Sequence, residues 1–244
     1  MATLRLLIVQ TGTVAEPLRQ EHGDYPAWFA RALGSAAEVT TLAAHEGQRL
    51  KPAQLDRAGI VVTGSPLSCT AGERQPWMDD LGHALLEAGK RGTPVLGVCF
   101  GQQLLARAAG GDVVNNPRGR EIGTVEVQLT EAGARDPLFG WLAGQGGRLD
   151  VQATHLDAVD PLPPGATLLA SNENSPVQAM RLSENVAGVQ FHPELRPEAL
   201  RALIASRAEK IRAEGGNAEA LIKGVRDTDS ARILEAFADF CSRG

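Results

Sequence analysis

The stretch Pro94-Val95-Leu96-Gly97-Val98-Cys99-Phe100-Gly101-Gln102-Gln103-Leu104-Leu105 decides how this chain folds. Its apolar beginning predicts a buried strand, and the spacing of Leu104, Leu105 and Ala108 predicts a helix, with Cys99 at the turn between them. A side chain held at such a corner crowds the residues two positions before and after it, and here both positions are glycine. The pattern therefore predicts a nucleophile elbow with a cysteine at its tip.

The predicted position of Cys99 favours a reactive thiol. Unpaired N–H groups and the dipole at the start of a helix stabilise the thiolate, which is the nucleophilic form. An inert buried thiol is the alternative for a lone cysteine, but the flanking glycines, strand and helix favour the nucleophile. Cys241 shares a helical face with Ile233, Leu234 and Phe237, so we expect that cysteine in the core.

Length and composition indicate one large α/β domain. The chain has 244 residues, of which 43% are hydrophobic. Its net charge of -5 argues against nucleic acid or an anionic membrane surface as a partner. The three cysteines are far apart and form no Cys-x-x-Cys pair, which favours a reducing compartment over disulfides or structural zinc. We expect neither a metal nor a cofactor.

The sequence shows no sign of a targeting or membrane-spanning segment. The apolar residues that follow Met1 are too few for the core of a signal peptide, and no cleavage pattern follows them. No apolar run approaches the about 20 residues that a membrane span needs. These features predict a cytoplasmic protein.

Strand and helix patterns along the chain predict a doubly wound fold. Apolar runs at residues 4–9, 39–42 and 59–62 predict strands, and helical patterns at 25–33 and 77–88 lie between or after them. The alternation of Val125, Val127 and Leu129 predicts antiparallel pairing in the second half. Further short strands are expected at residues 150–153, 166–170, 177–180 and 186–190.

We therefore predict a single-domain α/β fold with a mostly parallel, mixed sheet flanked by helices. Residues 1–195 would form this domain, and residues 196–244 a helical C-terminal extension packed on it. Leu200, Leu203, Ile204 and Ile211 share one apolar helical face in this extension.

A second candidate group lies in Phe191-His192-Pro193-Glu194, just after the last predicted strand. A cysteine nucleophile needs a base, and the base needs a third group to orient it and to stabilise its charge. His192 and Glu194 can supply both functions. The other histidines have simpler explanations, since we expect His22 and His45 in polar loops and His83 on a solvated helix face.

Together these motifs resemble the class I, triad-type glutamine amidotransferases, and most of all the amidotransferase domains of GMP synthases, here in a stand-alone form. The matching segments occur in the family's order between about residues 58 and 195: Gly64-Ser65-Pro66-Leu67-Ser68, residues 97–103, Gly110-Gly111, Arg120-Glu121-Ile122-Gly123, Thr154-His155-Leu156-Asp157 and residues 189–194.

The resemblance implies a role for each matched residue. Cys99 would attack the glutamine side-chain amide to form a γ-glutamyl thioester, His192 would move protons, and Glu194 would orient His192. The backbone N–H groups of Ser65 and Phe100 match the family's oxyanion hole. The remaining positions match the substrate-binding segments, namely Gly64, Gln103, Thr154, His155 and Asp157.

Two departures from the family pattern bear on function. Ser65 stands where the family commonly has a second glycine. The larger side chain of the serine would narrow the pocket. The sequence also contains no Ser-Gly-Gly-x-Asp-Ser loop and no Gly-x-x-x-x-Gly-Lys-Ser/Thr loop, so an ATP-using acceptor domain is not evident in it. The ammonia would then pass to an acceptor synthetase on another polypeptide. Three uses of residues 196–244 stay open: covering a sheet edge, forming a homodimer contact, or replacing a partner.

Other functions remain as alternatives to glutamine hydrolysis. A stand-alone γ-glutamyl peptidase would use the same thioester chemistry on γ-glutamyl amides or peptides. A non-catalytic subunit would keep the site only to bind a glutamine-like ligand, and a redox protein would use Cys99 as an oxidation sensor. Intact Cys99, His192 and Glu194 favour the enzymes over both of these.

Overall fold

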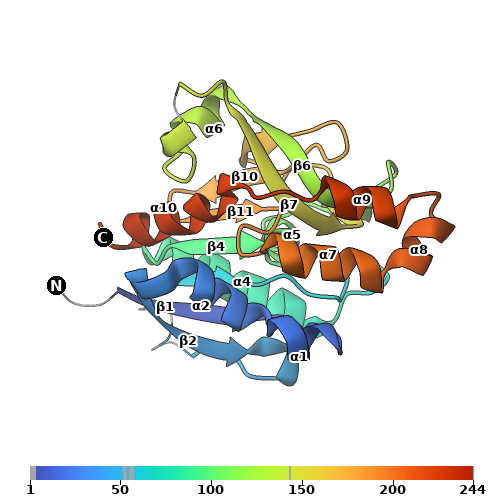
Figure 1. The fold of residues 1–244 in the computed structure, drawn as a ribbon. Coiled ribbons are helices and arrows are strands. Elements are labelled where there is room, and N and C mark those ends of the chain that lie inside the picture. The colour runs from blue at the N-terminus through green and yellow to red at the C-terminus, as the bar shows by residue number, and fades with distance from the viewer. Residues whose placement is uncertain (1–3, 52–53, 55–57, 143, 244) are drawn as a thin grey trace.

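The computed structural model describes residues 4–51, 54, 58–142 and 144–243. A sheet of nine strands forms its centre, in the order β2-β1-β3-β4-β11-β10-β9-β6-β7 (Figure 1). The strands are β1 (Leu4–Gln10), β2 (Ala37–Ala43), β3 (Gly59–Val62), β4 (Val95–Val98), β6 (Glu121–Leu129), β7 (Arg148–His155), β9 (Thr167–Ser171), β10 (Ala179–Ser183) and β11 (Val186–Val189). A separate small ribbon pairs β5 (Val113–Asn115) with β8 (Asp157–Val159).

The large sheet is mixed, with a parallel part that continues into an antiparallel part. β2, β1, β3, β4 and β11 all run in the same direction. β10, β9, β6 and β7 pair antiparallel with their neighbours. The predicted mixed, mostly parallel α/β architecture is therefore confirmed, and the short strands β3, β4 and β11 at its centre are buried on both faces.

Alternate residues of the parallel strands pack into two separate hydrophobic cores. Leu6, Val61 and Leu96 face a core that helices α2 (Tyr25–Leu33) and α10 (Arg232–Cys241) complete. Their sequence neighbours, such as Leu7 and Ile60, face a second core against α4 (Pro76–Lys90) and α5 (Phe100–Ala108). Helices thus cover both faces of the sheet, as a doubly wound fold requires.

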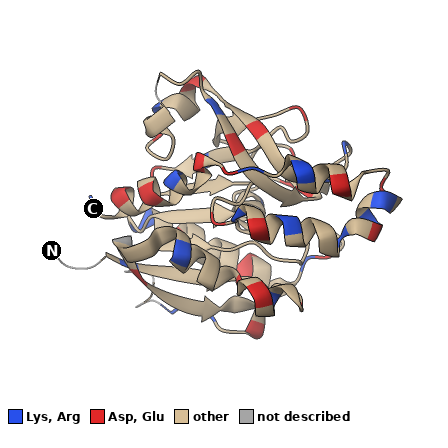
Figure 2. Ribbon diagram, in the orientation of Figure 1, with Lys and Arg blue, Asp and Glu red and all other residues tan. Residues whose placement is uncertain are grey.

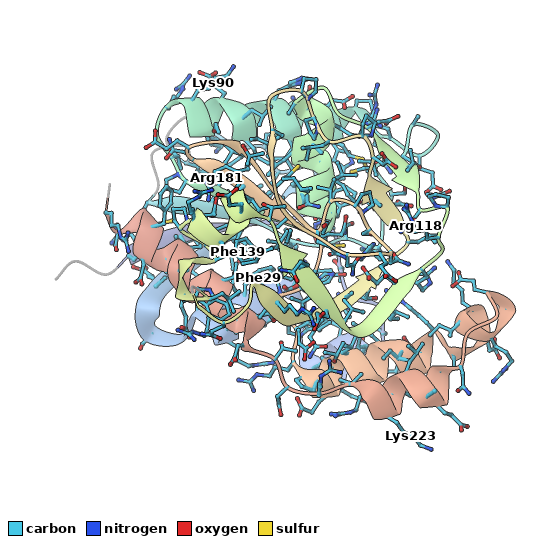
Figure 3. All side chains as sticks on the ribbon, turned by 90° about the horizontal axis from the view of Figure 1, so that it is seen from above. Phe29, Lys90, Arg118, Phe139, Arg181 and Lys223 are labelled. Carbon is cyan, nitrogen blue, oxygen red and sulfur yellow. The ribbon has the colours of Figure 1, made fainter. Side chains whose placement is uncertain are left out.

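The aromatic residues of the first core lie deep inside the molecule. Phe29 and Phe139 are fully buried, and Figure 3 shows them well inside the outline, whereas Lys90 and Lys223 lie at its edges. Cys241 is buried in this same core, as its helical spacing predicted. α10 therefore belongs to the central packing of the domain.

The remaining C-terminal helices form a third apolar cluster at one end of the sheet. Leu200, Ile204 and Ile211 pack there with Leu18 and Tyr25 near the N-terminus. The elements are α7 (Pro197–Ser206), α8 (Ala208–Ala213), α9 (Ala218–Gly224) and the short α1 (Leu18–His22). Figure 2 shows acidic and basic residues interspersed along α7 to α10.

The structure corrects three local predictions. The apolar face from Leu200 to Ile211 is divided between two helices, because the backbone breaks at Arg207 (φ -107°, ψ 11°). His22 lies in α1 and His45 in the 3-10 helix η2 (Ala44–Glu46), so the prediction of loops at both histidines is wrong. The other short helices are η1 (Gly34–Ala36), α6 (Glu131–Arg135), η3 (Gly140–Leu142) and η4 (Asp229–Ala231).

Candidate active site

Cys99 lies at the corner between β4 and α5. Its backbone has φ 52° and ψ -105°, and no other non-glycine residue in the described part of the chain has a positive φ. Such a conformation is strained and persists only where the surrounding structure holds it. Hydrogen bonds on both sides do so here: Cys99 N–H donates to Val189 O at 2.8 Å, and Gln103 N–H donates to Cys99 O at 3.1 Å. The geometry is that of a nucleophile elbow.

The two flanking glycines are required by the close approach of backbone to backbone. A Cβ at Gly97 would lie 2.6 Å from the carbonyl carbon and oxygen of Gly101. A Cβ at Gly101 would lie 2.5 Å from the carbonyl oxygen of Val62 on β3. Backbone atoms cannot move aside as a flexible side chain can, so these contacts leave room for glycine alone.

His192 and Glu194 follow β11, the strand beside β4. His192 N–H donates to Gln152 O at 2.8 Å, and His192 Nδ1 lies 2.7 Å from Glu194 Oε1. Both side chains are almost fully buried, with exposed fractions of 4% and 0%. Cys99 lies near enough to the ring of His192 to act on the imidazole through charge and hydrogen bonding. The fold therefore brings a thiol, an imidazole and a carboxylate into one connected row.

The charges around His192 decide its protonation. Burial acts to lower the pKa of the imidazole, but the Glu194 carboxylate and, after it, Cys99 act in the opposite direction through charge and hydrogen bonding. Their effect prevails and raises the pKa of His192 from 6.5 to about 10. The imidazole is therefore protonated at neutral pH, between the sulfur and the carboxylate.

Gly64 lies directly against this histidine. A Cβ at position 64 would lie 2.8 Å from His192 Cε1. The neighbouring Ser65 directs its hydroxyl to Thr11 O at 2.8 Å, and Ser65 Oγ also accepts a hydrogen bond from Leu67 N–H at 3.1 Å. Ser65 is thus held by the loop after β1, with its backbone beside the elbow.

A pocket of about 270 Å³ opens above Cys99. The sequence-predicted residues that line it come from three separate segments and are Ser65, Cys99, Phe100, Gln103, Thr154, His155 and Asp157. Phe100 is the first residue of α5, where backbone N–H groups have no partner inside the helix. Gly64, His192 and Glu194 lie beneath the lining.

Two of the lining side chains are committed to partners inside the protein. Gln103 Nε2 donates to Asp157 O at 3.0 Å and to Gln190 Oε1 at 3.2 Å. His155 Nε2 lies 2.9 Å from Glu121 Oε2, and His155 Nδ1 lies 3.1 Å from Asp157 O. The contacts of Gln103 and His155 brace the β7–β8 turn that carries Thr154 and Asp157.

The buried carboxylate of Glu121 holds His155 in this position. Burial acts to raise the pKa of Glu121, but hydrogen bonds from His155, Asn172 and Gln178, together with the charge of His155, lower it overall. Asn172 Nδ2 and Gln178 Nε2 each donate to Glu121 at 2.6 Å. Glu121 is therefore ionised at neutral pH, directly behind the pocket wall.

Sequence reasoning missed the cations of the pocket. Arg120, Arg207 and Lys210 line it, and the latter two come from the α7–α8 region. Arg120 lies within a segment that matches the family, but its charge was not considered. Arg207 carried no local signal, because an arginine in an amphipathic helix ordinarily faces solvent.

The other thiols have no comparable setting. Cys69 and Cys241 are buried, and burial is the main cause that raises the pKa of Cys241 to about 12 and that of Cys69 higher still. Among the residues that the structure describes, no group of three or more His, Cys, Asp or Glu side chains could hold a metal ion. No described helix is long and apolar enough to cross a membrane.

Comparisons with known proteins identify the family of this chain. The family model for class-I glutamine amidotransferases matches residues 27–208. A glutamine-hydrolysing GMP synthase of Thermomicrobium roseum is 40% identical over 141 residues, which is 58% of this chain and 24% of that protein. The GMP synthase of Pyrobaculum aerophilum is 32% identical over 175 residues, or 71% of this chain and 31% of that protein.

Solved structures share the whole fold. A glutamine amidotransferase of Thermotoga maritima has a TM-score of 0.77 at 20% identity and covers 100% of both chains. A putative GMP synthase subunit from Thermoplasma acidophilum has a TM-score of 0.63 at 20% identity, covering 100% of this chain and 96% of that one. The chain spans about a quarter of the length of the first curated relative, at 24%. Since the family model covers most of its length, this chain belongs to the class-I glutamine amidotransferase family.

Proposed function

We propose that this protein hydrolyses the side-chain amide of glutamine through a cysteine thioester and releases glutamate and ammonia. The observation that carries the proposal is the connected row of Cys99, His192 and Glu194 at the base of a pocket. A nucleophile at an elbow, a base in contact with it and a buried group that orients the base are the elements that covalent amide hydrolysis requires.

The reaction follows from the protonated state of His192. Cys99, as a thiolate, attacks the carbonyl carbon of the amide, and negative charge develops on the carbonyl oxygen. The backbone N–H groups of Ser65 and Phe100 would stabilise that charge. When the C–N bond breaks, the leaving nitrogen takes the proton of His192 and departs as ammonia. His192 then accepts a proton from water, which attacks the thioester and displaces the Cys99 thiolate together with glutamate.

The supporting residues fall into two groups: those that would touch the substrate, and those that keep the β7–β8 turn in position beside the pocket. Thr154 and Asp157 line the pocket and would touch the substrate. His155 uses both ring nitrogens and Gln103 uses its Nε2 inside the protein, so we assign them the positioning of the β7–β8 turn. Gly64 lets the imidazole of His192 approach the loop that carries Ser65.

The ammonia would serve an acceptor enzyme outside this sequence. The relatives are glutamine-hydrolysing GMP synthases, and this chain matches only a part of each. We propose a partner synthetase that docks near the loops of Ser65 and Cys99.

A stand-alone γ-glutamyl peptidase is the second candidate, and one observation favours it. Arg207 and Lys210, from the C-terminal helices of this chain, line the pocket. The site is thus partly enclosed by the chain's own residues. A peptidase that works without a partner needs such an enclosed site.

One experiment separates these functions. The purified protein is incubated with glutamine and, separately, with a set of γ-glutamyl dipeptides, and the release of glutamate and ammonia is measured. We expect glutamine hydrolysis that Cys99→Ala abolishes and that Cys69→Ala, which changes another buried cysteine, preserves. Dipeptide turnover without glutamine hydrolysis would replace the proposal with the peptidase, and binding of glutamine without any turnover would indicate a non-catalytic subunit.

A further inference from the structure

The break between α7 and α8 directs an arginine toward the pocket. Arg207 connects the two helices, with Ser206 as the last residue of α7 and Ala208 as the first of α8. Its Nη1 donates a hydrogen bond to Thr154 Oγ1 on β7, and its side chain lines the same pocket as Cys99. A residue of the C-terminal region therefore reaches the pocket that contains Cys99.

The guanidinium of Arg207 has no acidic partner in the described part of the chain. Arg120 and Arg181, which are also partly buried, do have one: Arg120 pairs with Glu214 at 2.8 Å, and Arg181 pairs with Asp136 at 2.5 Å. Burial is the main cause that lowers the pKa of Arg207. A partly buried cation without a counter-ion is unfavourable, so this arginine is suited to an anion supplied by a ligand.

A carboxylate without a cation lies on the same wall. Asp157 accepts hydrogen bonds from the neutral side chains of Ser68 at 2.6 Å and Asn115 at 2.5 Å. No basic side chain of the described residues forms an ion pair with it. Thr154, which contacts Arg207, and Asp157 stand at the two ends of the same short turn.

One ligand chemistry satisfies both unpaired charges. A zwitterionic α-amino acid group carries a carboxylate and an ammonium on one carbon, and glutamine and γ-glutamyl peptides both contain it. A guanidinium binds a carboxylate through charge-assisted, often paired hydrogen bonds. The opposite charges of Arg207 and Asp157 therefore match the end of the substrate that does not react.

We propose that Arg207 binds the α-carboxylate of the substrate. Asp157, which lies in the segment already expected to bind substrate, would then face the α-ammonium. This inference rests on the proposed function for the identity of the substrate. It makes the C-terminal helices part of the substrate site, because the break after α7 supplies the carboxylate-binding residue. Lys210 lies at the exposed rim and Arg120 is paired with Glu214, which leaves Arg207 as the cation for this purpose.

The test compares ligands that differ by one charged group. Glutamine has both groups, 4-aminobutanamide lacks the α-carboxylate, and glutaramate lacks the α-ammonium. Dissociation constants are measured by calorimetry on Cys99→Ala protein, which cannot turn over, with Arg207 intact, as Arg207→Gln or as Arg207→Lys. Arg212→Gln is the matched control, since Arg212 is an exposed residue of α8 that does not line the pocket.

We expect Arg207→Gln to weaken the binding of glutamine and glutaramate by about 10- to 100-fold, the effect of losing a charged hydrogen bond. Its effect on 4-aminobutanamide should stay within about twofold, and Arg207→Lys should restore part of the loss. In the active enzyme the loss should appear mainly in KM.

Three results would overturn the carboxylate subsite. Equal losses for all three ligands would mean that Arg207 shapes the pocket in general, and an unchanged affinity for glutamine would mean that it contacts no substrate. A fall in kcat for every substrate without a change in affinity would assign Arg207 to the Cys99 thiolate instead. If the wild-type protein hydrolyses no glutamine, the proposed function fails, and the same comparison with glutamate and 4-aminobutanoate still decides the subsite.

Discussion

Gly64→Ala is expected to displace the His192 ring without changing any of the reacting groups in the site. The new Cβ would lie 2.8 Å from His192 Cε1, whereas ordinary contact begins at 3.4 Å. The ring must therefore shift by about 0.6 Å, against the 2.7 Å hydrogen bond that ties it to Glu194. A misplacement of about 1 Å can reduce a catalysed rate about 100-fold, so we expect kcat to fall by about 10- to 100-fold.

The fold should survive this substitution. The obstructing atom is at the end of a side chain, so the overpacking cost should be near the low end of the usual range, about 1 kcal/mol. Gly72→Ala is the control, because a Cβ there would meet nothing within 4 Å.

The assay combines steady-state glutamine hydrolysis with thermal unfolding of both variants. KM should change less than kcat, because the α-amino acid group binds away from the imidazole. Full activity in a folded Gly64→Ala protein would refute the reasoning, since it would show that the position of His192 is not limiting.

The remaining predictions concern pH and stability. Because the pKa of His192 is raised from 6.5 to about 10, its stabilising interactions are complete below the unfolded value and are lost as pH rises through about 10. The alkaline limb of kcat/KM should therefore lie near pH 10, and Glu194→Gln should move it to lower pH; a limb near 6.5 in the wild type would contradict this. Gly101→Ala should lower the free energy of unfolding by about 3 kcal/mol, because its Cβ would meet backbone at 2.5 Å, while Gly140→Ala, with nothing within 4 Å, should change it little in the same denaturant titration. Glu121→Gln should be destabilising at neutral pH and less so in acid, because the lowered pKa of Glu121 gives stabilisation that is lost as pH falls through the folded value; a difference in unfolding free energy that is constant with pH would refute the buried charge.

The elbow and the class of fold were predictable from the order of the amino acids alone. The elbow could be predicted because its requirements are local: an apolar strand, a helix, and glycines at the two positions that the corner crowds. The structure shows that crowding directly, at Gly97 and Gly101. The strand at Gly59–Val62 and the helix at Tyr25–Leu33 were likewise predicted at their observed bounds, because periodicity and flanking glycines act within a few residues.

How distant segments of the chain meet depends on tertiary packing. β11 pairs with β4, and this pairing brings His192 and Glu194 to Cys99 across more than ninety positions of sequence. The short helices α1 and α9 depend on tertiary packing, since isolated helices of this length are unstable in water. The placement of Arg207 was equally hidden, because neither glycine nor proline marks the break between α7 and α8. A functional role for the charge of Arg207 becomes visible only in the folded protein, where packing places the guanidinium beside Thr154 and away from acidic side chains.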